Sequence, residues 1–114
     1  MMTRAPAPST YVEVDVRSRA HPGASVDAAF DAVADALHSM TLTPDADLAA
    51  NAGTHVLTFC LTFSGVVEPE SALGASLGIA REAIRGAGLD AAAWDVVRAS
   101  VEPTGNYAPL LQTA

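Results

Sequence analysis

Strict alternation of hydrophobic and polar positions predicts two strands, at residues 11–17 and 55–64. In the first, three valines alternate with polar or aromatic residues: Val12, Val14 and Val16 against Tyr11, Glu13, Asp15 and Arg17. In the second, large apolar side chains occupy one face and smaller ones the other: Leu57, Phe59, Leu61 and Phe63 against Val56, Thr58, Cys60 and Thr62. This pattern is typical of strands with one buried face.

Apolar residues spaced three and four apart predict two helices. The first covers residues 25–40, with Ser25 as a favourable N-cap, and its stripe consists of Val26, Phe30, Val33, Leu37 and Met40. The second begins at Pro69, a favoured first helical residue, and ends near Gly86. Its stripe consists of Leu73, Leu77, Ala80, Ile84 and Ala87.

The other segments give weaker signals. Residues 41–50 alternate weakly around Pro44, which predicts at most a short edge strand, and residues 51–53 read as a hairpin turn. A last strand is expected at 93–102, closed by Pro103. Residues 1–10 and 103–114 lack periodic apolar positions and are expected to be tails, which leaves 11–102 as one domain.

The expected order is strand, helix, strand, strand, helix, strand. This order predicts an α+β, ferredoxin-like fold, in which a four-stranded antiparallel sheet carries both helices on one face. Right-handed crossovers would bring the helices together through small side chains: Ala29, Val33 and Ala36 towards Ala72, Ser76, Ile79 and Ala83. The outer flank of the second helix would then present Gly74, Gly78, Arg81 and Arg85.

Composition narrows the possible functions. The 114 residues carry a net charge of −7, and all six basic residues are arginine, a usage that suggests a bacterial coding sequence rich in G and C. So few cations disfavour binding to nucleic acid or to anionic membranes. The first ten residues lack the apolar run of a signal peptide, and the single cysteine fits a reducing compartment. We expect a cytoplasmic protein.

No motif indicates catalysis, a metal or a cofactor. Cys60 falls in mid-strand without a histidine fixed beside it, and the fold would place His21 and His55 at one end of the sheet and His38 at the other. Phosphate-binding glycine motifs are missing. The charged residues of one sheet face read as a cross-strand network: Glu13, Asp15, Arg17, Arg98 and Glu102. We therefore expect a protein that is not an enzyme and has no cofactor.

The leading interpretation is a non-catalytic interaction module that forms a homodimer through the sheet face without helices. That face lacks the aromatic residues with which RNA-recognition domains stack bases. Val96 is expected to follow Trp94 on the same side as Arg98. The interface candidates are Tyr11, Thr58, Cys60, Trp94, Val96 and Arg98.

Two alternatives remain open. The residues from Ala20 to Gly23, between a strand and an apolar helix, resemble the Pro-Gly loop of ACT ligand-binding domains, which implies a regulatory domain of the same fold. The resemblance lacks the family's small-residue and asparagine pattern at the next strand, so no site is carried over. The residues themselves suggest a small-ligand site at His21, Gly23, Ser25, Asn51 and His55.

The second alternative is an acidic inhibitor or adaptor that binds a basic protein. Its docking stripe would consist of Asp27, Asp31 and Asp35 on the first helix, with neighbouring Asp45 and Asp47.

Overall fold

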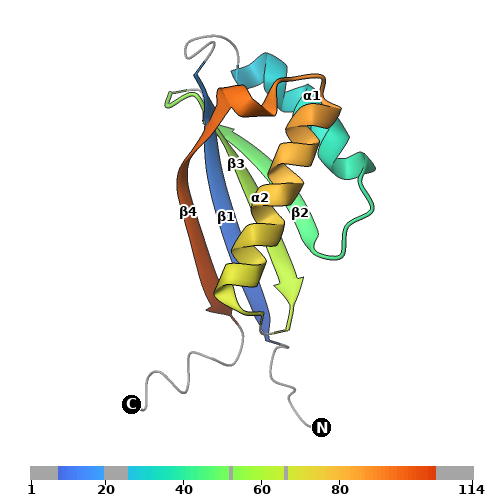
Figure 1. The fold of residues 1–114 in the computed structure, drawn as a ribbon, viewed down its shortest axis with the longest axis vertical. Helices are drawn as coiled ribbons and strands as arrows, with labels where there is room; N and C mark the ends of the chain where they lie inside the picture. The colour runs from blue at the N-terminus through green and yellow to red at the C-terminus, as the bar shows by residue number, and fades with distance from the viewer. Residues whose placement is uncertain (1–7, 20–25, 52, 66, 105–114) are drawn as a thin grey trace, which may run out of the picture.

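The protein is an α+β sandwich of one sheet and two helices (Figure 1). The computed structural model describes residues 8–19, 26–51, 53–65 and 67–104. The elements follow in the order β1 (Ser9–Ser18), α1 (Val26–Ser39), β2 (Asp45–Asn51), β3 (Val56–Ser64), α2 (Pro69–Gly86), a 3-10 turn η1 (Ala91–Ala93) and β4 (Trp94–Thr104). Within the described residues, neither helix is long and apolar enough to cross a membrane.

The sheet is antiparallel throughout, with the strand order β2-β3-β1-β4. The two strongly alternating strands, β1 and β3, are the central pair, and the two weaker ones form the edges. Each expected strand and helix is confirmed, with boundaries that differ by a few residues. Pro44 lies just before β2 rather than inside it.

The sheet is longer than the sequence predicts at one end. Ser9 and Thr10 pair with Thr104 and Pro103, so the expectation that Pro103 closes the last strand is wrong. The backbone explains why this proline is tolerated. The N–H of Arg19 donates to the Ala93 carbonyl at 2.8 Å, so every second residue of β1 counted back from Arg19 directs its backbone N–H and C=O towards β4. Thr10 is not one of these residues. Pro103, which lies opposite Thr10, therefore directs its own backbone groups away from β1. The missing N–H of Pro103 therefore costs no bond in this sheet.

The core lies between one face of the sheet and both helices. Val14, Phe59 and Leu48 occupy one cross-strand row and are buried, as are the neighbouring rows of β1 and β3. Both helices contribute to this single cluster, which places them on the same face of the sheet. The buried helical residues are Val33, Leu37, Ala72, Ala80, Ala83 and Ile84.

The helices approach each other closely near the C-terminal end of α2. A β-carbon added at Gly86 would lie 3.1 Å from the β-carbon of Ala36, tighter than an ordinary contact. This contact agrees with the expected packing of small residues between the helices. On the opposite flank of α2, Gly74 and Gly78 are exposed, as are Arg81 and Arg85.

A β-bulge in β4 changes which side chains share a face. Arg98 is opposite Asp15 and Val96 is opposite Val16, so Val97 is an extra residue in the ladder. Because one extra residue reverses the alternation, Val96 and Trp94 lie on the helix side of the sheet while Arg98 lies on the other. The expectation that Val96 shares a side with Arg98 is wrong for this reason.

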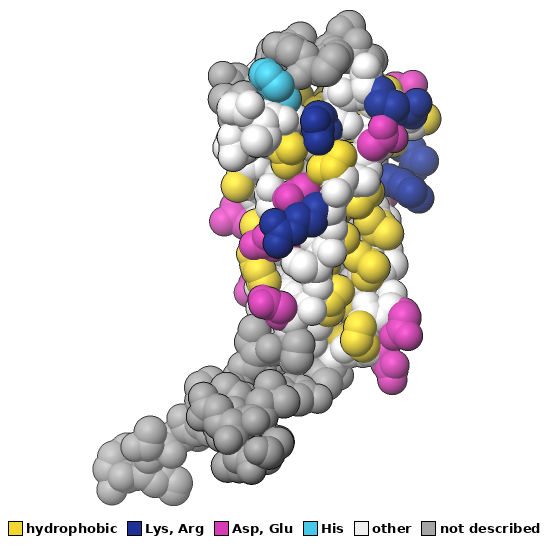
Figure 2. Space-filling model, turned by 90° about the vertical axis from the view of Figure 1, so that its left-hand side faces the viewer, with side chains coloured by type: hydrophobic (Ala, Val, Ile, Leu, Met, Phe, Trp, Pro, Cys, Tyr) yellow, Lys and Arg dark blue, Asp and Glu magenta, His cyan; other side chains and the backbone are white. Residues whose placement is uncertain are grey.

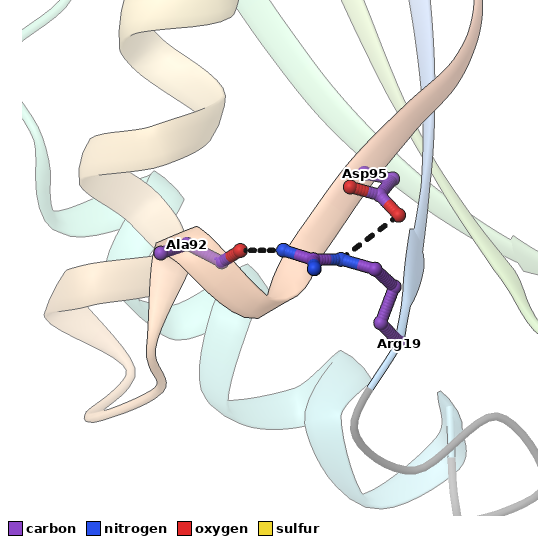
Figure 3. Close-up of polar contacts among 3 residues, drawn as sticks. All are labelled: Arg19, Ala92 and Asp95. Carbon is purple, nitrogen blue, oxygen red and sulfur yellow. Dashed lines mark hydrogen bonds and ion pairs between the residues drawn. The ribbon is translucent and has the colours of Figure 1, made fainter.

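Polar contacts fasten the end of β1 to the start of β4 (Figure 3). The Nε of Arg19 lies 3.0 Å from a carboxylate oxygen of Asp95, and the guanidinium also donates to the carbonyl of Ala92. The side chain of Asp90 accepts from the N–H of Ala92 at 3.0 Å and caps the 3-10 turn. These contacts hold Trp94 where β4 begins.

Candidate functional site: the bare sheet face and the free edge of β4

The face of the sheet opposite the helices, here called the bare face, is built by alternate residues of all four strands. Its cross-strand rows are Asp45, Thr62, Tyr11 and Glu102; Asp47, Cys60, Glu13 and Ser100; and Ala49, Thr58, Asp15 and Arg98. Sequence alternation predicted the contributions of β1 and β3 correctly. The structure thus brings together Tyr11, Thr58, Cys60 and Arg98 of the expected interface residues.

Hydrogen bonds within β1 and between β3 and β1 order the polar groups of the bare face. The hydroxyl of Tyr11 donates to a carboxylate oxygen of Glu13 at 2.9 Å, and that of Thr58 donates to Asp15 at 2.6 Å. The pKa of the Tyr11 phenol is raised above its ordinary value by its contact with Cys60, and to a lesser extent by burial and by Glu13. Tyr11 therefore remains a neutral hydrogen-bond donor at physiological pH.

The bare face is acidic. It carries six carboxylates and two guanidinium groups: Glu13, Asp15, Asp45, Asp47, Asp95 and Glu102 against Arg17 and Arg98. An open hollow of about 420 Å³ lies over this face at the β2 edge, bordered by Tyr11, Asp47 and Cys60. Stacking two such faces on each other would oppose like charges, so the bare face favours a cationic neighbour over a second copy of itself.

Cys60 is half-buried, and its cross-strand neighbours are Glu13 and Asp47. Within the described part of the chain, no group of three or more histidine, cysteine or acidic side chains is arranged to hold a metal ion.

Trp94 and Val96 are separated from the other expected interface residues. They border a hollow of about 230 Å³ between β4 and α2, together with Val16, Leu77 and Ile84. Trp94 is half-buried against the core, which makes it a packing residue at this end of the sheet. The bulge at Val97, which alternation alone does not reveal, is the cause of the separation.

The expected ligand site falls mainly on residues outside those that the structure describes, since His21, Gly23 and Ser25 all lie there. The side-chain oxygen of Asn51 accepts from the N–H groups of Gly53 at 3.0 Å and Thr54 at 3.2 Å. These hydrogen bonds stabilise the turn before β3. His55 completes this turn with a positive φ of 58°.

The expected acidic stripe divides into two surfaces. Asp31 and Asp35 are exposed on α1, whereas Asp45 and Asp47 belong to the bare face on the opposite side of the sheet. The side chain of Asp27 lies outside the described part of the chain. The two groups of aspartates therefore lie on opposite sides of the sheet and do not form one continuous stripe.

The outer side of β4, here called its free edge, is a surface that sequence reasoning missed. The alternation that directs Pro103 outward does the same for Ala99 and Val101, so their N–H and C=O groups point away from β1. Residues 95–99 are exposed, and Figure 2 views this edge directly. The signal available in the sequence is Pro103, because a proline inside a strand marks an edge.

Comparison with protein-family models, with curated proteins and with solved structures finds no match to this chain.

Proposed function

We propose that the chain is a non-catalytic interaction protein of ferredoxin-like fold that associates with a second copy of itself. The observation that carries the proposal is the free edge of β4, an 11-residue strand whose outward backbone groups have no neighbouring strand among the described residues. An open strand edge is a ready template for pairing with another chain. The element order and the strand order support the fold assignment.

The two edges of the sheet differ in how well they resist pairing. β2 has 7 residues, follows Pro44, and carries the charged side chains of Asp45 and Asp47. These are features by which proteins block edge-to-edge contact. In β4, the bulge at Val97 and the proline at 103 lie towards the two ends and leave residues 98–102 regular. Association through β4 alone stops at the dimer, because the protected β2 edge of each copy does not pair with a further copy.

Charge also favours the edge over the bare face as the self-association surface. Face-to-face stacking would bring the surplus carboxylates of two copies together, whereas edge pairing keeps both bare faces in solvent. The dimer would then present two acidic faces to other molecules.

Sedimentation equilibrium of the purified protein tests this proposal. We expect the mass to rise from the monomer value of 11.6 kDa towards twice that value as the concentration increases through the micromolar range. The rise reflects mass action on a reversible dimer. A constant mass of 11.6 kDa at every concentration, up to about 1 mM, would contradict self-association.

A further inference from the structure

We propose that two copies join their sheets through β4 in one antiparallel register, with Ser100 of each copy facing Ser100 of the other. This inference rests on the proposed self-association and specifies its geometry. The two sheets become one continuous eight-stranded sheet, related by a two-fold axis perpendicular to it. The feature that selects the register is the position of Arg98 and Glu102 at equal distances on either side of Ser100.

Backbone geometry allows this register. Because Ala99 and Val101 direct their N–H and C=O groups outward, only registers that place outward residues opposite one another form a hydrogen-bonded ladder. With Ser100 on the axis, Ala99 of each copy lies opposite Val101 of the other, and each such pair exchanges two hydrogen bonds. Ser100 then faces its counterpart in a non-hydrogen-bonded pair, in which side chains lie closest.

Charge complementarity distinguishes this register from its neighbours. Arg98 and Glu102 are both exposed on the bare side, and within the residues that the structure describes neither forms an ion pair. In the proposed register, Arg98 of each copy faces Glu102 of the other across a non-hydrogen-bonded pair. Shifting by two residues pairs neither charge with its opposite, and shifting by four pairs Arg98 with Arg98 or Glu102 with Glu102.

The irregular positions of β4 also fit the register. Val97, the extra residue of the bulge, lies opposite Pro103 of the second copy. The N–H that Pro103 lacks is therefore missing only at the two ends of the paired segment. Between these ends, residues 98–102 pair without interruption, so the bulge and the proline bound one self-complementary stretch.

A strip of hydrophobic side chains runs beside the free edge on the helix side (Figure 2). Val101 of β4 is half-buried there, and Leu73 and Leu77 of α2 are half-buried on the core cluster. A two-fold axis perpendicular to the sheet brings the strips of the two copies next to each other and covers apolar surface that is partly exposed in one copy. The same axis leaves both bare faces on one side of the dimer.

Charge exchange tests the register. We expect Arg98→Glu alone and Glu102→Arg alone each to weaken the dimer about tenfold or more, because each turns two attractive pairs into repulsive ones. The double variant R98E/E102R restores opposite charges in both pairs, so we expect it to recover most of the wild-type affinity. Asp31→Arg on α1 is the matched control for a charge change away from the edge, and we expect it to leave the affinity unchanged.

Disulfide trapping provides a second, independent measurement. In a Cys60→Ser background, Ser100→Cys places two thiols across the axis, where Cα atoms of a non-hydrogen-bonded pair lie about 4.5 Å apart, within reach of a disulfide. Oxidised glutathione accepts the two electrons as the bond forms. We expect rapid cross-linking of Ser100→Cys. The control Ala99→Cys should cross-link poorly, because its two copies are offset by two residues and separated by more than about 7 Å.

The outcomes separate the register from self-association itself. Recovery in the double exchange together with selective trapping at residue 100 supports the register. A dimer that persists with unchanged affinity in both single exchanges, and that does not trap at residue 100, overturns the register while leaving self-association intact. A wild-type protein that remains monomeric at every concentration overturns both.

Discussion

Replacing Phe59 with alanine is expected to lower the free energy of unfolding by about 3–5 kcal/mol. Phe59 is fully buried in the central strand β3 and faces Val14 on one side and Leu48 on the other. Truncation removes a large apolar side chain and leaves a cavity between the sheet and the helices. Urea denaturation followed by circular dichroism, at one fixed protein concentration, measures the loss.

Phe63→Ala is the matched control for this change. Phe63 belongs to the same strand and the same face but is only half-buried at the end of β3. We expect its truncation to cost clearly less than that of Phe59, because less apolar surface returns to water. Equal losses for the two variants would contradict the position of the core.

Replacing Thr10 with valine is expected to lower the free energy of unfolding by about 2–3 kcal/mol, although the two side chains have nearly the same shape. Thr10 is 2% exposed, and its hydroxyl donates to the carbonyl of Gly65 and accepts from the N–H of Val67, each at 3.1 Å. Valine leaves both backbone groups without this partner. The loss is measured by the same urea denaturation.

Thr10→Ser tests whether the hydroxyl is responsible. Serine keeps the donor and acceptor and loses only a methyl group, so we expect it to retain more stability than Thr10→Val. The account of this contact fails if valine is tolerated as well as serine.

Thr10 also shows where prediction from the sequence stops. The sequence places it in a tail, because residues 1–10 lack periodic apolar positions and contain two prolines. Its hydrogen-bond partners lie 55 and 57 residues further along the chain, and no local pattern reveals them. Alternation succeeded for the central strands because every second side chain of β1 and β3 enters the core. Their periodicity therefore reports burial directly.

β4 was harder to predict because alternation fails where a strand has an irregular backbone. One extra residue at Val97 moves Trp94 and Val96 to the helix side, and nothing in the apolar pattern marks that position. Pro103 suggested a strand end because it cannot donate in a ladder, yet its N–H position faces away from β1. Both features depend on the register in which β4 pairs with β1, and the sequence of β4 alone does not specify that register.

Amide hydrogen exchange at individual residues of β4 tests most directly whether this strand is the self-association surface. The amides of Ala99 and Val101 point outward in one copy, whereas that of Ser100 points towards β1. We predict that the amides of Ala99 and Val101 exchange fast in dilute protein and at least about tenfold more slowly at concentrations where the dimer forms, while Ser100 is protected in both. Equally fast exchange of Ala99 and Val101 at both concentrations would contradict association through the free edge.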